Sequence, residues 1–190
     1  MELKPPAYLM LGMVRLGARS GYAIKRAADA STRFFWPTSL AQVYPALGRL
    51  EQAGLLRREE DHQGARARHS YELSEEGEAA LVEWLRAAEE APVQFRDEGL
   101  LRLFFADSLP LADQIALVRR LRERNEAAAA AIAEHVEPYA AELERRGRRF
   151  PALAAGLGAE SFTQAAAWLA RLEAELVAEA AGDSSDASAG

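Results

Sequence analysis

Apolar residues at helical spacing predict three short helices in the first third of the chain. The first covers about 7–16 and stops at Gly17, a residue that favours the end of a helix. The second covers about 21–30, with Ser20 as its N-cap. The third is expected to run over about 38–53, with a threonine as its cap and a glycine after its end.

The third predicted helix has two distinct faces. Its apolar residues repeat at intervals of three and four, which places on one buried stripe Leu40, Val43, Leu47 and Leu50. The opposite face carries small or hydrogen-bonding side chains that suit close approach to a polar surface: Thr38, Gln42, Ala46 and Arg49. Pro45 removes a backbone donor from the helix interior at a cost of roughly 3 kcal/mol, so a kink or distorted turn is expected there.

A β-hairpin is predicted after the third helix. Two strands, about 55–61 and 67–73, flank a tip at 62–66, and Tyr71 and Leu73 alternate as a half-buried strand requires. Ser74 then caps a fourth helix with acidic residues in its first turn, where the helix dipole favours them. This helix is expected to reach position 90, and its apolar stripe is Leu81, Trp84, Leu85 and Ala88.

The remainder, beyond Pro92, is predicted to be all helical. The segment 94–106 is too apolar on every side to stand alone in water, so it must be buried between elements or subunits. From position 111 onward, apolar residues alternate spacings of four and three, interrupted by Arg122 and Asn125. Such a seam requires a partner helix, and Pro138 is expected to bend the helix that carries it.

The sequence therefore predicts two domains and a tail. Residues 1–86 form a helical module with a hairpin, and residues 87–181 form an all-helical domain. The last helix is expected over about 159–181, because Gly156 and Gly158 loosen the chain before it. Residues 182–190 consist of Gly, Asp, Ser and Ala, which is typical of a disordered tail.

The charge differs between the two halves. The whole chain of 190 residues has a net charge of −6, which argues by itself against binding nucleic acid. Residues 1–86, however, carry 12 Lys and Arg against 11 Asp and Glu, whereas the rest carries 11 against 18. The average thus hides a nearly balanced first half and an acidic second half.

Catalytic chemistry has little support in the sequence. There is no cysteine, which excludes disulfides, thiolate nucleophiles and cysteine-ligated metals, and no cofactor is predicted. His62 and His69 flank the hairpin tip, but a solvated hairpin is a far better interpretation of that spacing than a metal site. An enzyme with a carboxylate site at Glu89 or Glu90 is a minor alternative. No apolar run could span a membrane, so a cytoplasmic protein is expected.

Three helices followed by a hairpin is the order of a winged helix, in which the third helix enters the major groove of DNA. Cations lie where they could neutralise phosphates: Lys25, Arg26, Arg49, Arg66 and Arg68. Gln42 and Thr38 could then face base edges. Two other interpretations remain open: a plain solvent-exposed helix face with locally paired charges, and a winged helix that binds only proteins. Tyr44 is either an aromatic at the edge of the core or a phosphate donor.

Several short motifs narrow these alternatives. They are Gly21-Tyr22-Ala23-Ile24, Phe35-Trp36-Pro37, Gln42-Val43-Tyr44-Pro45-Ala46-Leu47, Arg49-Leu50-Glu51, Gly54-Leu55 and the run from Tyr71 to Gly77. Together they closely resemble the PadR family of bacterial transcriptional regulators. The Tyr-Pro pair inside a helix is locally disfavoured, so it is a specific signal. The later residues Phe95, Arg96, Leu100, Phe104 and Phe105 resemble the opening of the helical domain in the family's larger subgroup.

The resemblance implies a homodimeric winged-helix repressor whose C-terminal helices dimerise and whose affinity for DNA a small molecule often lowers. It assigns recognition-helix positions to Ser39, Gln42, Tyr44 and Arg49, and the basic wing to Arg66 and Arg68. His69 stands where Lys or Arg is common, so contact between the wing and DNA is expected to be weaker or to depend on pH.

An effector would act by favouring one spacing of the two recognition helices over another. A pocket for a flat apolar molecule could be lined by Trp84, Phe95, Phe104, Phe105 and Trp168. The favoured alternative is that these aromatic residues belong to the core and the dimer interface.

Overall fold

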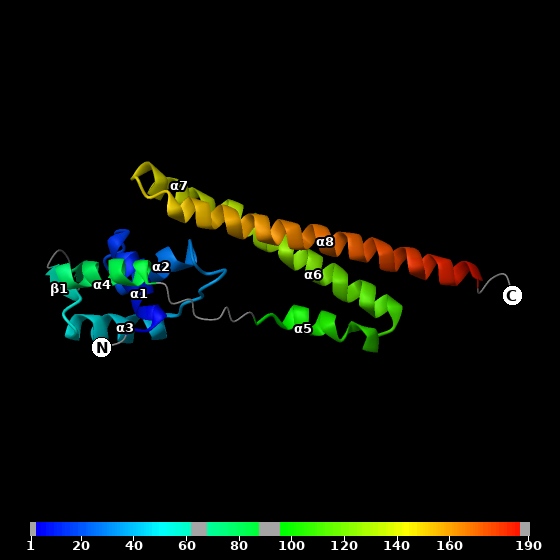
Figure 1. The fold of residues 1–190 in the computed structure, drawn as a ribbon, viewed down its shortest axis with the longest axis horizontal. Helices are drawn as coiled ribbons and strands as arrows, with labels where there is room; N and C mark the ends of the chain where they lie inside the picture. The colour runs from blue at the N-terminus through cyan, green and yellow to red at the C-terminus, as the bar shows by residue number, and fades with distance from the viewer. Residues whose placement is uncertain (1–2, 62–67, 88–95, 187–190) are drawn as a thin grey trace. The chain divides into compact units, whose positions relative to one another are not determined.

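The computed structural model describes residues 3–61, 68–87 and 96–186, and the chain divides into two units, Met1–Ala91 and Pro92–Gly190 (Figure 1). The first unit contains α1 (Pro5–Arg15), α2 (Gly21–Asp29), α3 (Leu40–Gln52), β1 (Leu56–Asp61), β2 (Arg68–Leu73) and α4 (Glu75–Arg86). The strands pair antiparallel, with Leu56 opposite Leu73 and Asp61 opposite Arg68. The predicted winged-helix order of three helices and a hairpin is confirmed.

The core of the first unit lies where α1, α2 and α3 meet. The side chains of Leu11, Ile24, Val43 and Leu47 have no exposed surface. Leu40, predicted to be buried, is 41% exposed, and Ala46, predicted to face outward, is only 3% exposed. The buried stripe of α3 therefore starts one turn later than the spacing predicted, and it includes the small Ala46.

Pro45 does not interrupt α3, which runs continuously from Leu40 to Gln52. A proline in this position leaves the carbonyl of Ala41 without its usual N–H donor. Both Ala41 and Pro45 are exposed, so water can bind that carbonyl. The local cost of the proline therefore falls on the outer face of the helix and not in the core.

Ser74 begins α4 as predicted: its hydroxyl oxygen accepts a hydrogen bond from the Gly77 N–H at 3.0 Å. The helix ends at Arg86, earlier than predicted, because the next residue, Ala87, has extended backbone angles. The predicted apolar stripe holds only in part. Leu81 is buried, but Leu85 is 67% exposed.

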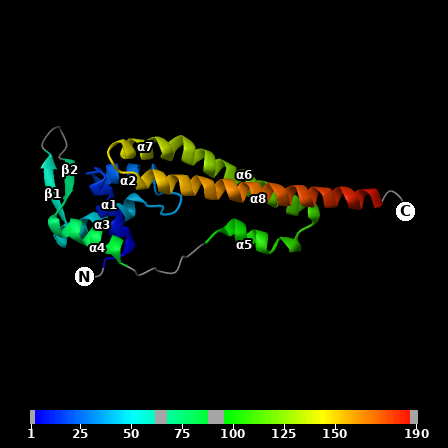
Figure 2. The same cartoon turned by 45° about the horizontal axis from the view of Figure 1, so that its top comes forward.

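The second unit contains α5 (Glu98–Phe104), a 3-10 turn η1 (Ala106–Ser108), α6 (Leu111–Ala131), a π-helical turn η2 (Ile132–Val136), α7 (Glu137–Arg145) and α8 (Phe150–Asp186). In both views α8 lies alongside α6 and α7, as the second arm of a helical hairpin (Figures 1 and 2). The helix predicted to need a partner therefore packs against α8 of the same chain. Val118 of the predicted seam packs with Leu169 of α8, together with Leu117 and Leu121, which the predicted seam did not include.

A π-helical turn, η2, lies directly before Pro138, where a bend was expected. Pro138 is the second residue of α7, and the helical backbone runs on through both elements. Ile132 and Val136 remain buried through this turn. The extra residue of the π turn therefore keeps the apolar seam facing α8.

The last helix differs from the prediction at both ends. α8 begins at Phe150, runs through Gly156 and Gly158, and continues past Ala181 to Asp186. Each helical glycine costs only about 1 kcal/mol, and the alanines around them favour a helix. A Cβ on Gly158 would stand 3.4 Å from Cδ1 of Ile132, so this glycine lies close to the π turn. The predicted tail is helical over 182–186.

Gly77 lets α4 pack directly against the end of α3 and the hairpin. A Cβ at Gly77 would overlap the carbonyl oxygen of Leu55, and backbone atoms cannot move aside as a flexible side chain can. We therefore expect Gly77→Ala to lower the free energy of unfolding by about 1–3 kcal/mol, as measured by urea denaturation followed by circular dichroism.

Gly48→Ala is the matched control for this measurement. Gly48 lies in the interior of α3, and nothing lies within 4 Å of the position that a Cβ would take. Alanine should be neutral there or stabilise by up to about 1 kcal/mol. Equal loss of stability in both variants would contradict the role given to Gly77.

Candidate nucleic-acid interface

One face of α3 is buried in the core, and the opposite face is therefore exposed to solvent. Val43, Leu47 and Leu50 anchor the helix, while a set of exposed residues points away from the core: Ala41, Gln42, Tyr44, Pro45 and Arg49. Of the residues predicted for this face from spacing, Gln42 and Arg49 lie on it and Ala46 does not. The resulting surface is polar at its start, aromatic in the middle and cationic towards its end.

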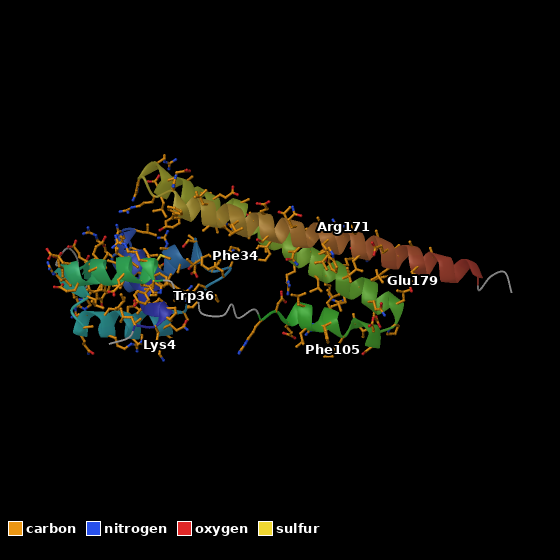
Figure 3. All side chains as sticks on the ribbon, in the orientation of Figure 1. Lys4, Phe34, Trp36, Phe105, Arg171 and Glu179 are labelled. Carbon is orange, nitrogen blue, oxygen red and sulfur yellow. The ribbon has the colours of Figure 1, made fainter. Side chains whose placement is uncertain are left out.

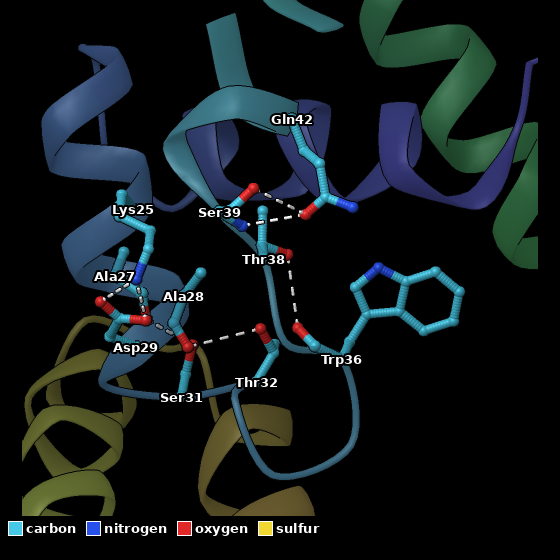
Figure 4. A network of polar contacts seen from close by, with 10 residues as sticks. All are labelled: Lys25, Ala27, Ala28, Asp29, Ser31, Thr32, Trp36, Thr38, Ser39 and Gln42. Carbon is cyan, nitrogen blue, oxygen red and sulfur yellow. Dashed lines mark hydrogen bonds and ion pairs between the residues drawn. The ribbon is translucent and has the colours of Figure 1, made fainter. Parts of the chain in front are cut away.

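The start of α3 is capped by Ser39 and not by Thr38 as predicted. The Ser39 N–H donates a hydrogen bond to Oε1 of Gln42 at 2.9 Å, and the Ser39 hydroxyl lies 3.2 Å from the same oxygen (Figure 4). The Thr38 hydroxyl donates instead to the carbonyl of Trp36 at 3.4 Å. This arrangement is a capping box, which holds Gln42 in place before any ligand binds.

The capping box leaves the other end of the Gln42 side chain for contacts outside the protein. Its carbonyl oxygen is engaged with Ser39, so the amide nitrogen is the group still able to donate. Gln42 is exposed. An exposed amide donor on the outer face of α3 suits a hydrogen-bond acceptor on a base edge or a phosphate.

Lys25 forms an ion pair that the sequence analysis did not identify. It is half-buried on α2 and forms an ion pair with Asp29, one turn along the same helix (Figure 4). A pair between residues four apart on a helix contributes only a few tenths of a kcal/mol, so Lys25 could exchange it for a phosphate. The ion pair lowers the charge that α2 offers to an approaching anion.

Tyr44 lies against the start of α2, and more than half of its side chain remains exposed. A Cβ on Gly21 would stand 2.6 Å from Cε1 of Tyr44, so any side chain at position 21 would overlap the Tyr44 ring. The exposed fraction of Tyr44 is 55%. The structure thus supports a surface aromatic held by packing, with its hydroxyl group available to a phosphate.

The wing is described only in its strands. Arg66 lies outside the described residues, and so does the side chain of Arg68, although its backbone pairs with Asp61 in the hairpin. His69 is exposed and stands opposite Glu60 in the register. His62, the other half of the alternative metal site, also lies outside the described residues.

The aromatic residues predicted to line an effector pocket have different surroundings within the two units. Trp84 stacks on Tyr8 within the first unit, with ring centroids 4.7 Å apart and planes 7° from parallel. Phe104 and Phe105 form an edge-to-face pair at the end of α5, exposed by 78% and 59% (Figure 3). Phe95 lies outside the described residues. Trp168 lines a cavity within the second unit.

An ion pair that the sequence analysis did not identify anchors α5 to α6. Asp97 caps α5 by accepting from the Gly99 N–H at 2.7 Å, and its two oxygens bind Arg124 at 2.8 and 2.6 Å. The hydrogen bonds from Arg124 hold the pKa of the Asp97 carboxyl below its usual value, although burial opposes them. An aspartate directly before a helix is the sequence signal that could have identified this cap.

Gly99 completes the anchor. A Cβ there would stand 2.5 Å from Cδ2 of Leu121 and 2.6 Å from Nη1 of Arg124. Glycine therefore allows α5 to approach α6 closely enough for the Asp97–Arg124 pair to form.

The sequence raised two catalytic alternatives, a metal site at the hairpin and a carboxylate site at Glu89 or Glu90. Within 3–61, 68–87 and 96–186, no three His, Cys, Asp or Glu side chains gather as a metal ion would require. Glu89 and Glu90, the carboxylates of the enzyme alternative, lie outside the described part of the chain. Among the helices described, none is long and apolar enough to cross a membrane.

Comparison with known proteins gives two adjacent matches. Residues 10–83 match the transcriptional regulator PadR-like family, and residues 95–177 match a domain described as virulence activator alpha C-term. A curated relative, the negative transcriptional regulator PadR of Bacillus subtilis, is 30% identical over 103 residues. That alignment covers 54% of this chain and 57% of the relative, so it spans little more than half of either protein.

Solved structures show the same fold over nearly the whole chain. Bacillus subtilis PadR in complex with operator DNA has a TM-score of 0.78 at 22% identity, covering 91% of this chain and 99% of that one. The same protein with p-coumaric acid gives a TM-score of 0.70 at 21% identity, covering 92% and 98%. The Vibrio cholerae virulence activator AphA gives 0.67 at 22% identity, covering 92% and 99%.

The winged helix, the helical second unit and the two adjacent matches define one class of protein: winged-helix transcriptional regulators, not enzymes. The chain belongs to the PadR-like family of this class, in the subgroup that carries the virulence-activator type of C-terminal domain. The resemblance carried by the Tyr44–Pro45 segment is thereby confirmed.

Gln42 offers a test of the capping box. Gln42→Ala removes the acceptor for the Ser39 N–H and should lower the free energy of unfolding by about 0.3–1.5 kcal/mol. Gln42→Glu keeps an oxygen at the same distance along the side chain, so its stability should stay within about 0.5 kcal/mol of the parent. Thermal or urea denaturation measures both. An equal loss in the two variants would mean that the cap contributes no stability.

Proposed function

We propose that the protein is a homodimeric, cytoplasmic DNA-binding repressor whose affinity for its operator is lowered by a small-molecule effector. The observation that carries the proposal is the outer face of α3. Its apolar side is buried in the core, and its exposed side carries the Gln42 amide, the Tyr44 hydroxyl and the Arg49 guanidinium. These groups donate hydrogen bonds to base edges and phosphates.

The proposed contacts divide into two kinds. Gln42, with Thr38 and Ser39 beside it at the start of α3, is proposed to face base edges in the major groove. Tyr44, Arg49 and Lys25 are proposed to bind phosphates, together with Arg66, Arg68 and His69 of the wing. The capping box supports the role of Gln42, because a side chain that is already held in place loses less conformational entropy on binding.

The solved relative supports DNA as the ligand. Bacillus subtilis PadR, which shares the fold over 91% of this chain, is in complex with operator DNA. The nearly balanced charge of residues 1–86 also favours DNA binding by this module, since all of the excess acidic charge lies in the second half.

Dimerisation is supported by the apolar surface of the second unit. Large apolar side chains are exposed on α5, among them Leu101 at 58% and Phe104 at 78%. Others on α8 are Leu153 and Leu157, at 57% and 69%. So much exposed apolar surface marks a site of association, and a second copy of the chain would bury it. Two recognition helices would then meet two half-sites about one turn of DNA apart.

The solved complex of Bacillus subtilis PadR with p-coumaric acid supports a small-molecule effector. An effector lowers affinity for DNA only if it binds more tightly to a dimer whose recognition helices do not match the operator. A winged helix that binds only proteins is the alternative, and the acidic average charge is the observation that favours it. Absence of salt-dependent DNA binding would decide for that alternative.

The electrostatic part of the proposal can be tested at Arg49. Arg49→Ala should lower affinity for a labelled duplex of mixed sequence and reduce the slope of log affinity against log salt by about 1, because one phosphate contact is lost. Arg66→Ala on the wing should do the same. Fluorescence anisotropy over a range of salt concentrations measures the slope.

Arg171→Ala is the matched control, since it removes the same charge from an exposed position on α8 (Figure 3). Its slope should equal that of the parent protein. An unchanged slope in Arg49→Ala, or the same reduction in the control, would remove Arg49 from the DNA contacts. Selection of bound fragments from random duplex DNA would then give the operator and test sequence preference directly.

The proposed dimer can be tested at Phe104. A charge introduced by Phe104→Glu should shift the assembly from twice the chain mass towards the monomer, because an interface core does not accommodate an unpaired carboxylate. Ser108→Glu adds the same charge at a nearby exposed polar position and should leave the assembly unchanged. Size-exclusion chromatography with light scattering measures the mass. A parent protein that is monomeric at micromolar concentration would contradict the dimer.

A further inference from the structure

The second unit contains a cavity of about 360 Å³ between α5, α6 and α8. This volume is within the range of pockets that bind small molecules. All three helices belong to one unit, in which α6 packs along α8 and α5 packs on α6 (Figure 1). The cavity is therefore formed by a single folded body of one chain.

The walls of the cavity are mainly apolar and include one large aromatic surface. Leu100 and Leu103 of α5, Leu121 of α6 and Leu169 of α8 contribute aliphatic side chains. Trp168 contributes an indole and is 51% exposed. A planar apolar molecule could stack on the indole and remove both surfaces from water.

One buried polar side chain lines this apolar cavity. Asn125 is only 7% exposed, and its amide nitrogen donates to the carbonyl of Leu121 at 2.7 Å. Because a backbone carbonyl only accepts, this bond fixes which end of the amide is which. The carbonyl oxygen of Asn125 has no hydrogen-bond partner among the described residues. It is an acceptor placed at the wall of the cavity.

The charged groups at the cavity neutralise each other. Asp97 and Arg124 both line it, and both oxygens of Asp97 are bound by the guanidinium of Arg124. A ligand with a carboxylate would have to compete with Asp97 for Arg124, and a cationic ligand would have to compete with Arg124 for Asp97. The site therefore favours a neutral ligand over a charged one.

We propose that this cavity binds a neutral, planar, largely apolar molecule whose single hydroxyl or amine group donates a hydrogen bond to Oδ1 of Asn125. Its ring system stacks on Trp168, and its donor group binds the carbonyl oxygen that Asn125 presents at the wall. The site shares Trp168 with the predicted aromatic pocket. Naming this ligand the effector rests on the proposed function, whereas binding itself does not require DNA.

The test uses 2-naphthol as the probe and the full-length protein. Two fused rings with one hydroxyl group match the proposed chemistry, and isothermal titration calorimetry measures affinity and stoichiometry. We expect one site per chain. 2-Methoxynaphthalene keeps the rings but cannot donate, so it should bind about 2–10-fold more weakly. In Asn125→Leu the two probes should bind with equal affinity, because the acceptor is gone.

A cavity-filling variant tests the location. Ala165 of α8 lines the cavity, so Ala165→Leu should weaken 2-naphthol by at least about tenfold. Ala170→Leu makes the same change at an exposed position of α8 that does not line the cavity, and its affinity should equal that of the parent. Circular dichroism checks that each variant is folded.

Each other outcome contradicts a stated part of the proposal. No binding of 2-naphthol, or equal loss in the two alanine variants, would overturn the site. A preference for 2-naphthol that persists in Asn125→Leu would overturn the hydrogen bond. If p-coumaric acid binds more tightly than 2-naphthol, and Ala165→Leu also weakens its binding, the choice of a neutral ligand is overturned. If the protein binds 2-naphthol but shows no salt-dependent affinity for DNA, the ligand site stands and the proposed function as a DNA-binding repressor is overturned.

Discussion

The packing of α3 against α1 and α2 is the constraint on which the proposed DNA-binding surface depends. Val43, Leu47 and Leu50 are fully buried or nearly so, which fixes the rotation of the helix about its axis. Once that rotation is fixed, Gln42, Tyr44 and Arg49 can point only outward. A smaller apolar stripe would let the helix roll, and the same side chains would no longer share one surface.

The sequence predicted the order and most bounds of the elements because their signals are local. Ser20, Gly54 and Ser74 mark helix ends by the hydrogen bonds or backbone angles that they allow. The choice of cap for α3 was wrong, although the correct signal was present. Ser39 has a glutamine three residues later, as a capping box requires, whereas Thr38 has Ala41 in that position.

Features that depend on packing could not be predicted in the same way. Gly156 and Gly158 are weak helix formers, but packing along α6 and α7 keeps α8 continuous through them. The aromatic pocket was the less favoured of two interpretations and rested on residue type alone. No sequence signal indicated that Trp84 stacks on Tyr8. Asn125 was identified as an interruption of the apolar seam. That it lines a cavity became visible only when α5 and α8 were placed beside α6.

The capping box has a consequence for how the regulator could change its operator. The side chain of Gln42 closes the start of α3 and also supplies the amide proposed to read a base. Most substitutions that would prefer another base at this point would also loosen the first turn of the helix. Selection for a new target sequence is therefore tied to folding at this position. Among the other acidic and amide side chains, only glutamate is long enough to replace Gln42 and keep the cap.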